Sequence, residues 1–362
     1  MRRDQLPTPS LVLDLDTLDR NIATMVAHAA VSGVALRPHA KSHKSVEIAL
    51  RLHAAGVLGP ACATIAEAEA MTAGGLVGIL VTSPLVSDDA LARVGRLLAS
   101  GGDLTLVVDD LANVAALAQL AASIGLTLPL VVELDVGVGR TGCPEPEQAL
   151  VVARAIAAAP SLRFAGVQAY WGNLQQVRPL AERKARVQEA AAPLQRLLTL
   201  LRIAGLPPEI VTGGGTGTSF IDPTLGLFTE LQPGSFLFLD SCYGPLPLDD
   251  IGNPFAASLF VAAGIVSASR RHRVIVNAGL KALATDSGQP LPVRGAPDGS
   301  SYRFMGDEHG AIEFAQSIAP TLGSTIELLT SHCDPTVNLH ARYHVVRGDM
   351  VVDVWPIVAR GY

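Results

Sequence analysis

Between residues 35 and 240, short apolar runs alternate with longer stretches in which apolar residues recur every three or four positions. That spacing is typical of helices that bury one face, and short runs rich in β-branched residues are typical of strands. The predicted helices cover residues 46–55, 66–73, 88–98, 111–124, 146–158 and 179–204. The predicted strands cover residues 35–39, 60–65, 78–82, 104–108, 130–135, 163–170, 209–212 and 235–240.

This alternation predicts a parallel α/β fold. Eight strands over roughly 230 residues favour a closed (β/α)₈ barrel over a doubly wound sheet, because such a barrel typically needs about 250 residues. Active sites of these barrels lie at the carboxyl ends of the strands. The residues that follow each strand are therefore the first candidates for chemistry.

Outside this region the pattern is different. An apolar, proline-flanked segment covers residues 6–16, and residues 16–31 are predicted to form a helix that enters the barrel. After about residue 245 helical spacing largely disappears, and Gly, Pro, Asn and Asp turns separate short β-type runs. We therefore expect a barrel over residues 1–245, whose first residues can join the second domain, and a mainly β domain over residues 246–362. The β-type runs cover residues 255–266, 273–277, 326–329, 344–347 and 350–355.

Composition excludes several classes of function. The chain has 362 residues, of which 49% are hydrophobic, and a formal net charge of −6. Acidic and basic residues are interspersed, so we expect no nucleic-acid partner. No uninterrupted apolar stretch approaches about 20 residues, the length of a membrane-spanning helix, so we expect no membrane association. The four cysteines (Cys62, Cys143, Cys242 and Cys333) are scattered, which suits reduced thiols and a cytoplasmic protein.

A lysine follows the first predicted strand, in Arg37-Pro38-His39-Ala40-Lys41-Ser42-His43-Lys44. Alone, such a lysine is more often a surface or salt-bridging residue. At a strand end, however, Lys41 faces the barrel mouth, where a partly desolvated lysine near other cations can form a Schiff base. Lys44 competes for this role, but we expect it to belong already to the next helix.

A glycine-rich run, Thr212-Gly213-Gly214-Gly215-Thr216-Gly217-Thr218, follows the seventh predicted strand. Glycines let the backbone approach an anion and direct N–H groups at it, and threonines add hydroxyl donors. A second run, Gln232-Pro233-Gly234-Ser235, leads into the eighth predicted strand. Barrels often bind phosphate at these two positions. We therefore predict a phosphate site, with a flexible turn as the alternative for either run alone. Its candidate residues are Thr212, Gly214, Gly215, Thr216, Gly234 and Ser235.

A Schiff-base lysine and a phosphate site in one barrel imply a phosphorylated aldehyde cofactor, and pyridoxal phosphate fits. Arg140, after the fifth strand, and Tyr170, after the sixth, could contact its ring or phenolic oxygen. Either residue could equally be structural.

A third motif, His332-Cys333-Asp334-Pro335-Thr336, lies in the β domain. In an extended segment His332 and Asp334 would point to the same side, because side chains alternate with period two, and Cys333 would point away. An imidazole and a carboxylate make half of a site for Mn²⁺, Mg²⁺ or Co²⁺. The alternative is a polar turn that ends at Pro335. The similar cluster Gly306-Asp307-Glu308-His309-Gly310 could border the same site.

Together these residues resemble the family of D-threonine aldolase and D-serine dehydratase, whose members are similar to alanine racemase in fold. The resemblance extends from Leu6-Pro7-Thr8-Pro9 through these motifs and Ala278-Gly279-Leu280-Lys281-Ala282 to the end of the chain. It implies that Lys41 is the Schiff-base lysine, that His332 begins the metal motif, and that the β domain covers the barrel of the other subunit in a homodimer. It also places Thr216, Gly234 and Ser235 on the phosphate.

The residue two after the histidine is informative within that family. In that family the dehydratases carry a His-x-Cys motif and bind zinc. The D-threonine and D-3-hydroxyaspartate aldolases instead carry the motif His-Cys-Asp-Pro-Thr. This chain has His332-Cys333-Asp334, and a carboxylate favours a harder ion than zinc. The resemblance therefore implies a carbon-carbon lyase that cleaves D-3-hydroxy amino acids such as D-threonine to glycine and an aldehyde, with Lys41 and His332 in catalysis.

Other functions stay open at this point. Cleavage of D-3-hydroxyaspartate is one, and metal-assisted β-elimination by a D-serine or D-threo-3-hydroxyaspartate dehydratase is another, with Lys41 removing the Cα proton. Relatives usually carry a histidine near the end of the stretch that reads Asn173-Leu174-Gln175-Gln176 here, which leaves the substrate side chain open. A pyridoxal phosphate-binding protein without turnover is the alternative of another class, but single-domain barrels of that type lack a β domain and a metal motif.

Overall fold

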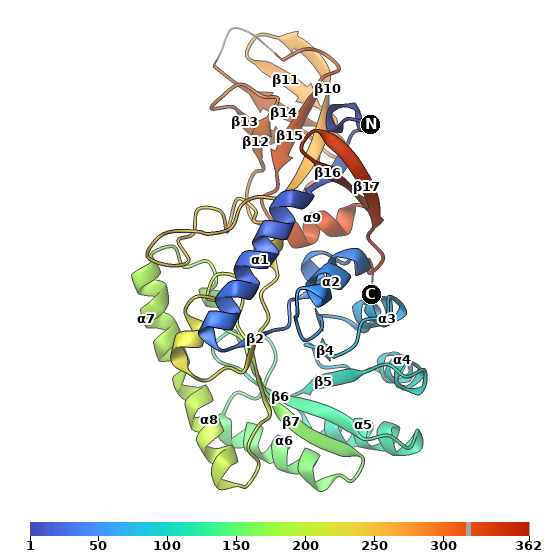
Figure 1. Cartoon of the computed structure of the whole chain (residues 1–362), viewed down its shortest axis with the longest axis vertical. Helices are drawn as coiled ribbons and strands as arrows, with labels where there is room; N and C mark the ends of the chain where they lie inside the picture. Colours follow the sequence, from blue (N-terminus) through green and yellow to red (C-terminus); the bar gives the residue numbers. More distant parts are fainter. Residues whose placement is uncertain (316–319, 362) are drawn as a thin grey trace.

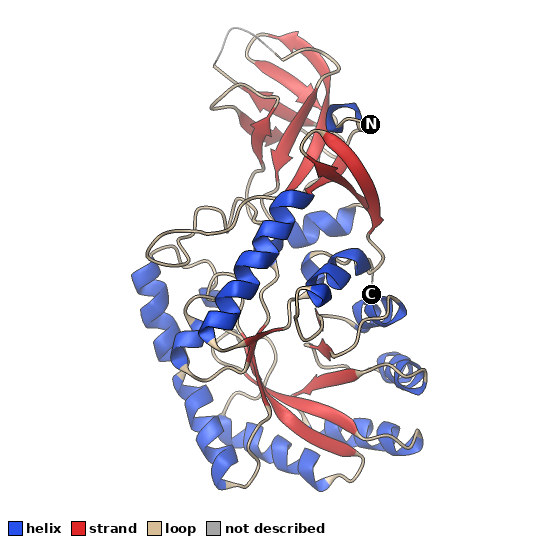
Figure 2. Cartoon of the chain, viewed as in Figure 1, coloured by secondary structure: helices blue, strands red, loops and turns tan. Residues whose placement is uncertain are grey.

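The computed structural model describes residues 1–315 and 320–361. Its strands gather in two places, which Figure 2 shows at the two ends of the molecule. One group forms a parallel sheet surrounded by helices, and the other forms a mainly antiparallel sheet. The long helix α1 (Leu15–Ser32) runs from the second group along the first (Figure 1).

In the described part of the chain, the first sheet holds eight strands and every pairing in it is parallel. Its order, β2-β9-β8-β7-β6-β5-β4-β3, would leave β2 and β3 as edges, but a bridge between His39 and Ala61 links them. The sheet therefore curls into a barrel, which confirms the predicted fold class. The strands are β2 (Ala35–Leu36), β3 (Ala61–Cys62), β4 (Ile79–Val81), β5 (Leu104–Val108), β6 (Leu128–Leu134), β7 (Leu162–Ala169), β8 (Ile210–Gly213) and β9 (Glu230–Leu231).

The eighth strand is not where the sequence predicted it. Residues 235–240 form a 3₁₀ turn (η5, Ser235–Leu237) and an irregular continuation, whereas β9 lies five residues earlier. The apolar run is buried because it packs between the two sheets, so its hydrophobicity does not mark a strand. The backbone N–H of Phe236 donates to Thr216 Oγ1 at 3.0 Å, which holds the turn against the glycine loop.

Helices cover the outside of the barrel, and local sequence explains their ends. Asp14, Thr64, Ser87 and Asp110 each accept a backbone N–H bond at the start of a helix, as capping residues do. The single helix predicted over residues 179–204 is two helices that break at Ala191, because Pro193 can occupy only a first turn. These helices are α2 (Val46–Ala54), α3 (Ile65–Ala73), α4 (Asp88–Ala99), α5 (Leu111–Ser123), α6 (Pro146–Ala158), α7 (Leu180–Ala190) and α8 (Ala192–Ile203).

The barrel interior has an apolar layer and, nearer the carboxyl ends of the strands, a polar one. Leu80, Val107, Val131 and Ala165 form an apolar cluster apart from the main core. Hydrogen bonds connect the side chains of the polar layer; for example, Gln168 Nε2 donates to Glu133 Oε1 at 3.0 Å. Most of these buried polar atoms are hydrogen-bonded, and Glu133 Oε2 is the exception, without a partner among the described residues. The barrel can therefore present a polar floor to a ligand above it. The other members of this layer are Thr82, Thr212 and Gln232.

The second sheet takes its strands from both ends of the chain. Strand β1 (Ser10–Asp14) lies between β10 and β16, antiparallel to the first and parallel to the second. Three of its short strands, β12, β13 and β14, have no counterpart in the sequence prediction. Its members after β1 are β10 (Leu259–Arg270), β11 (Arg273–Val276), β12 (Leu291–Arg294), β13 (Ser301–Phe304), β14 (Gly310–Glu313), β15 (Thr325–Leu329), β16 (Arg342–Arg347) and β17 (Met350–Pro356).

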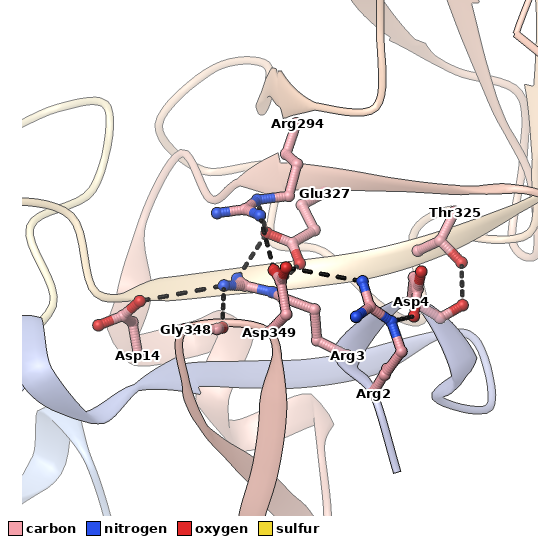
Figure 3. A network of polar contacts seen from close by, with 9 residues as sticks. All are labelled: Arg2, Arg3, Asp4, Asp14, Arg294, Thr325, Glu327, Gly348 and Asp349. Carbon is pink, nitrogen blue, oxygen red and sulfur yellow. Dashed lines mark hydrogen bonds and ion pairs between the residues drawn. The ribbon is translucent and has the colours of Figure 1, made fainter.

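A buried ion pair fixes the N-terminus to this sheet (Figure 3). The guanidinium of Arg3 donates to both carboxylate oxygens of Glu327, at 2.6 and 2.7 Å. Arg294 lies 3.5 Å from the same carboxylate on its exposed side. Removing one partner of such a pair destabilises the fold, because the charge of the other partner stays buried without compensation.

None of the helices in residues 1–315 and 320–361 is long and apolar enough to cross a membrane. All four cysteines are free thiols.

Candidate active site

A cavity of about 410 Å³ opens at the carboxyl ends of the barrel strands, where the second sheet meets the barrel. This volume falls in the range typical of small-molecule and cofactor sites. It brings together residues that are more than 290 positions apart in the sequence. Of the residues predicted from sequence, its walls contain Lys41, Arg140, Tyr170, Gly214, Gly215, Thr216, Gly234, Ser235, His332 and Asp334.

Lys41 lies in the 3₁₀ turn η2 (Ala40–Ser42), which follows β2. Its Nζ is 4.0 Å from Asp334 Oδ2, and its side chain is 41% exposed to the cavity. Lys44 is not in the following helix as predicted: it has a φ of 50° and lies before α2. Its Nζ contacts Glu67 Oε1 at 3.3 Å and the Ala359 carbonyl at 3.2 Å, which gives it a structural role.

His39 is the residue of this turn that sequence reasoning passed over. Its ring lines the cavity, and its Nε2 lies 3.2 Å from the Thr82 hydroxyl. Burial, with a smaller contribution from Lys41, lowers the pKa of His39 well below the ordinary value of 6.5. At neutral pH the imidazole is therefore uncharged.

Two loops share the barrel wall of the cavity with Lys41, and both consist of glycine and hydroxyl residues. Gly214 and Gly215 follow β8, and Gly234 and Ser235 follow β9. A side chain at position 214 would approach Asp222 Oδ2 at 2.4 Å, on a backbone whose φ is +71°. The loops are joined by the bond from the Phe236 N–H to Thr216 Oγ1.

A buried scaffold supports the first loop. Trp171 Nε1 donates to Asp222 Oδ1 at 2.8 Å, and the Thr218 hydroxyl donates to Asp222 Oδ2 at 2.6 Å. Gln175 Oε1 accepts the Gly217 N–H at 3.0 Å, and Gln175 Nε2 donates to Thr218 Oγ1 at the same distance. Burial raises the pKa of Asp222 to about 7. The stretch after β7, whose departure from relatives left the substrate side chain open, therefore holds the glycine loop.

His332 and Asp334 both face the cavity, but not for the predicted reason. The segment is not extended: helix α9 (Cys333–Leu339) begins directly after His332, with Pro335 in its first turn. A proline fits there because first-turn N–H groups need no helical acceptor. Asp334 Oδ1 is buried without a hydrogen-bond partner among the described residues. His332 Nδ1 lies 2.5 Å from Asp286 Oδ2, which leaves Nε2 for another partner.

Cys333 points away from the cavity, as predicted. Its backbone N–H and its thiol both donate to Asp240 Oδ2, at 3.0 and 3.3 Å. Burial raises the pKa of Cys333 well above the ordinary value of 9.0, and the nearby Asp240 raises it further. A thiol that stays protonated is a poor metal ligand.

Arg140 and Tyr170 lie together at the mouth. The guanidinium carbon of Arg140 is 5.9 Å from the centre of the Tyr170 ring, a cation-π distance. Burial raises the pKa of Tyr170, and Arg140 partly opposes that shift. The Arg140 loop is held by Asp135, whose carboxylate accepts backbone N–H groups from the three residues 137–139.

Two predicted site features lie elsewhere. Thr212 is buried under the cavity, where its hydroxyl accepts a bond from Gln232 Nε2 at 2.8 Å, because it belongs to the polar layer of the barrel. The cluster of residues 306–310 forms the turn before β14, and its Glu308 pairs with Lys281 at 2.6 Å on the surface. Neither lines the cavity.

These residues fit the cofactor and the ion implied by the sequence. The two glycine loops line the same cavity as a lysine amine, and side chains at Gly214 and Gly215 would collide with Asp222 and Gln175 behind the first loop. The orphaned oxygen of Asp334 and the open edge of His332 offer two ligands of the kinds that harder transition metals accept. In residues 1–315 and 320–361 no group of three or more His, Cys, Asp or Glu could hold a metal by itself, so the remaining ligands would be water or substrate.

Known families match both parts of the chain. The alanine racemase N-terminal domain matches residues 13–242, and the putative serine dehydratase domain matches residues 258–346. A 3-hydroxy-D-aspartate aldolase of Paracoccus denitrificans is 38% identical over 100% of this chain and 94% of its own length. A D-threonine aldolase of Arthrobacter sp. is 39% identical over 99% of this chain and 94% of its own.

Solved structures agree. The crystal structure of D-threonine aldolase from Filomicrobium marinum has a TM-score of 0.94 and 38% identity, with 98% of this chain and 95% of that chain covered. The D-threo-3-hydroxyaspartate dehydratase of Delftia sp. has a TM-score of 0.88 and 27% identity, with 99% of each chain covered. The chain is therefore more similar to the aldolase than to the dehydratase, in both TM-score and sequence identity.

Proposed function

This chain belongs to the alanine racemase-like family that includes D-threonine aldolase and 3-hydroxy-D-aspartate aldolase, and on that premise we propose that it is a carbon-carbon lyase. Its reaction is the cleavage of D-3-hydroxy amino acids to glycine and an aldehyde, with pyridoxal phosphate and a divalent metal ion. The observation that carries this proposal is the meeting of Lys41 with His332 and Asp334 across one cavity.

Lys41 and the two glycine loops would hold the cofactor. Lys41 Nζ would bind its aldehyde carbon, and the loops at Gly214–Thr216 and Gly234–Ser235 would bind its phosphate. When bound, pyridoxal phosphate supplies an electron-accepting ring for the pair of electrons released as the Cα–Cβ bond breaks. Arg140 and Tyr170 at the mouth would orient that ring.

His332 Nε2 and Asp334 Oδ1 would hold the metal ion. A divalent cation there supplies Lewis acidity toward the β-hydroxyl oxygen of the substrate, which makes that hydroxyl easier to deprotonate. Mn²⁺, Mg²⁺ or Co²⁺ suits this ligand set better than Zn²⁺, because Asp334 offers a hard oxygen and Cys333 is bound to Asp240.

Two nitrogen groups of the cavity differ in how they could handle protons. Lys41 Nζ would hold a proton within reach of the substrate Cα and could deliver it there to complete glycine. His39 stays uncharged because burial lowers its pKa, and the same shift makes it a weak base. Asp334 lies next to Lys41 and would keep the substrate hydroxyl close to the same amine.

Product analysis tests the reaction. With pyridoxal phosphate, Mn²⁺ and D-threonine we expect equal amounts of glycine and acetaldehyde, and L-threonine should give neither. With D-3-hydroxyaspartate the same cleavage would give glycine and glyoxylate. Release of ammonia with 2-oxobutyrate from D-threonine would instead assign the chain to β-elimination, the reaction type of its dehydratase relative.

We also propose a cytoplasmic homodimer. The four scattered cysteines support the compartment. The dimer is supported by the family resemblance alone, in which one subunit's β domain covers the other's barrel. Light scattering on the purified holoprotein should give about twice the mass of 37.7 kDa. A mass equal to one chain at working concentration would contradict the dimer without affecting the assignment of Lys41.

A further inference from the structure

A short segment of the second sheet's connections is bound along helix α9. Residues 282–287, which we call the strap, lie between β11 and β12 in the sequence. The Ala284 N–H donates to Thr336 Oγ1 at 3.2 Å, and the Ser331 hydroxyl donates to the Ala284 carbonyl at 3.1 Å. At the far end of the helix, His340 Nε2 lies 2.9 Å from the Ala282 carbonyl. The strap is thus fixed to both ends of α9.

Asp286 occupies the end of the strap beside His332. Its Oδ2 lies 2.5 Å from His332 Nδ1, and the Ser287 hydroxyl donates to the same oxygen at 2.9 Å. The carboxylate is about half exposed, whereas the His332 side chain is 27% exposed. The contact of this carboxylate with the imidazole connects the strap directly to the predicted metal motif.

The contact determines which ring nitrogen is available. An ionised carboxylate can only accept, so Nδ1 of His332 carries the proton and Nε2 carries the lone pair. Asp286 is not itself a ligand in this arrangement. An ion bound by Nε2 would lie on the opposite edge of the ring from the Asp286 oxygen.

We propose that Asp286 is a positioning residue that fixes the tautomer and the ring orientation of His332, so that Nε2 is preorganised as a ligand for the divalent ion. This inference rests on the proposed function, because it takes His332 as the metal ligand. Carboxylates that hold the second nitrogen of a ligating histidine commonly raise metal affinity in this way. The strap supplies what such a role needs, which is a carboxylate fixed relative to the helix that carries the histidine.

The test is Mn²⁺ affinity, measured by calorimetry on the full chain loaded with pyridoxal phosphate. We expect Asp286→Ala to weaken Mn²⁺ binding by about 10- to 100-fold, and Asp286→Asn to weaken it less, because an amide oxygen still accepts from Nδ1. Asp307→Asn is the matched control, since Asp307 is a surface carboxylate that contacts Lys281 and does not line the cavity. The absorbance of the bound cofactor should be unchanged in all three variants.

Saturating Mn²⁺ should restore the turnover of Asp286→Ala, whereas a merely structural defect would not be rescued by metal. Mn²⁺ affinity within twofold of wild type in Asp286→Ala, together with complete loss in His332→Ala, would overturn the positioning role and leave the proposed function intact. Unchanged affinity in His332→Ala would overturn the metal assignment itself and this inference with it. The asparagine variant keeps the volume of the side chain, so the question is answered even where the alanine variant folds poorly.

Discussion

The two walls of the cavity are built in different ways. The barrel wall consists of backbone in two glycine loops and one lysine, and a buried scaffold of Trp171, Gln175 and Asp222 supports it. The opposite wall consists of the side chains of His332, the residue directly before the seven-residue helix α9, and Asp334 in the first turn of that helix. That helix is held by the strap on one side and by Asp240 on the other.

The difference shows how each wall depends on its surroundings. A phosphate site made of backbone groups needs small residues at fixed positions along the chain, so it can be recognised from a short run of consecutive residues. A pair of side-chain ligands needs an orientation that neighbours far away in sequence must supply, such as Asp286 for His332. A substitution in one wall should therefore impair the binding function of that wall and leave that of the other wall intact. The following substitutions test this.

The largest effect should come from Lys41→Ala. We expect turnover to fall by about 10²- to 10⁴-fold, because the residue both binds the cofactor and transfers a proton. The absorbance band of the Schiff base should disappear, while Mn²⁺ affinity should stay within about twofold. Lys44→Met is the control and should keep the band, since Lys44 contacts Glu67 and the Ala359 carbonyl instead. A band that persists in Lys41→Ala would refute this assignment.

His332→Ala perturbs the other wall alone. We expect turnover to fall on the order of 100-fold or more, to the level of wild type treated with a chelator, because both lose the Lewis acid. The absorbance band of the cofactor should remain. Turnover in wild type that a chelator does not reduce would contradict a role for metal in this cavity.

Each of the two sheets contains a buried arginine-glutamate pair, so matched substitutions can compare how much each pair contributes to stability. Arg37 donates to both oxygens of Glu230 in the barrel, at 2.7 and 2.9 Å, as Arg3 does to Glu327 in the second sheet. Arg37→Met should destabilise by about 3–5 kcal/mol, because it leaves the Glu230 charge buried alone. Arg3→Met should destabilise less, since Arg294 remains 3.5 Å from Glu327 (Figure 3). Urea unfolding of both variants measures the difference, and an equal or reversed order would contradict this account.

Asp222→Asn should have the smallest effect, and one that depends on pH. The pKa of this carboxyl is raised from 3.8 to about 7 in the folded chain by burial, so between these values the folded state holds a proton that the unfolded state has lost. Its contribution to stability is therefore full below about pH 4, falls as pH rises and is lost above about pH 7. The variant should thus gain about 3 kcal/mol relative to wild type as the pH rises from 5 to 8.

Urea unfolding at both pH values measures this gain, with Asp307→Asn as an exposed control. A difference between variant and wild type that is the same at pH 5 and pH 8 would place the pKa of Asp222 in the folded chain below 5. In that case the negative charge would persist under the glycine loop at neutral pH, and phosphate binding would have to overcome it.

Several features could be read from the sequence because they depend on neighbours along the chain. Alternation of strands and helices predicted the barrel, and Lys41 and the two glycine runs were found from their places after predicted strands. The prediction of a strand at residues 235–240 was wrong because a buried apolar run has the same composition whether it pairs with a strand or packs between two sheets. Helix α9 was missed for a related reason, since its seven residues are too few to show a helical period.

The sequence by itself determined the order of elements, the glycine positions of the barrel wall and the choice of a carboxylate at position 334, because each is a property of adjacent residues. The tertiary structure decided which of these groups meet. It brought His332 and Asp334 to Lys41, placed Asp286 on the imidazole and put Trp171 and Gln175 beneath the glycine loop. Contacts between residues dozens to hundreds of positions apart depend on how the two sheets pack, and no local pattern records that packing.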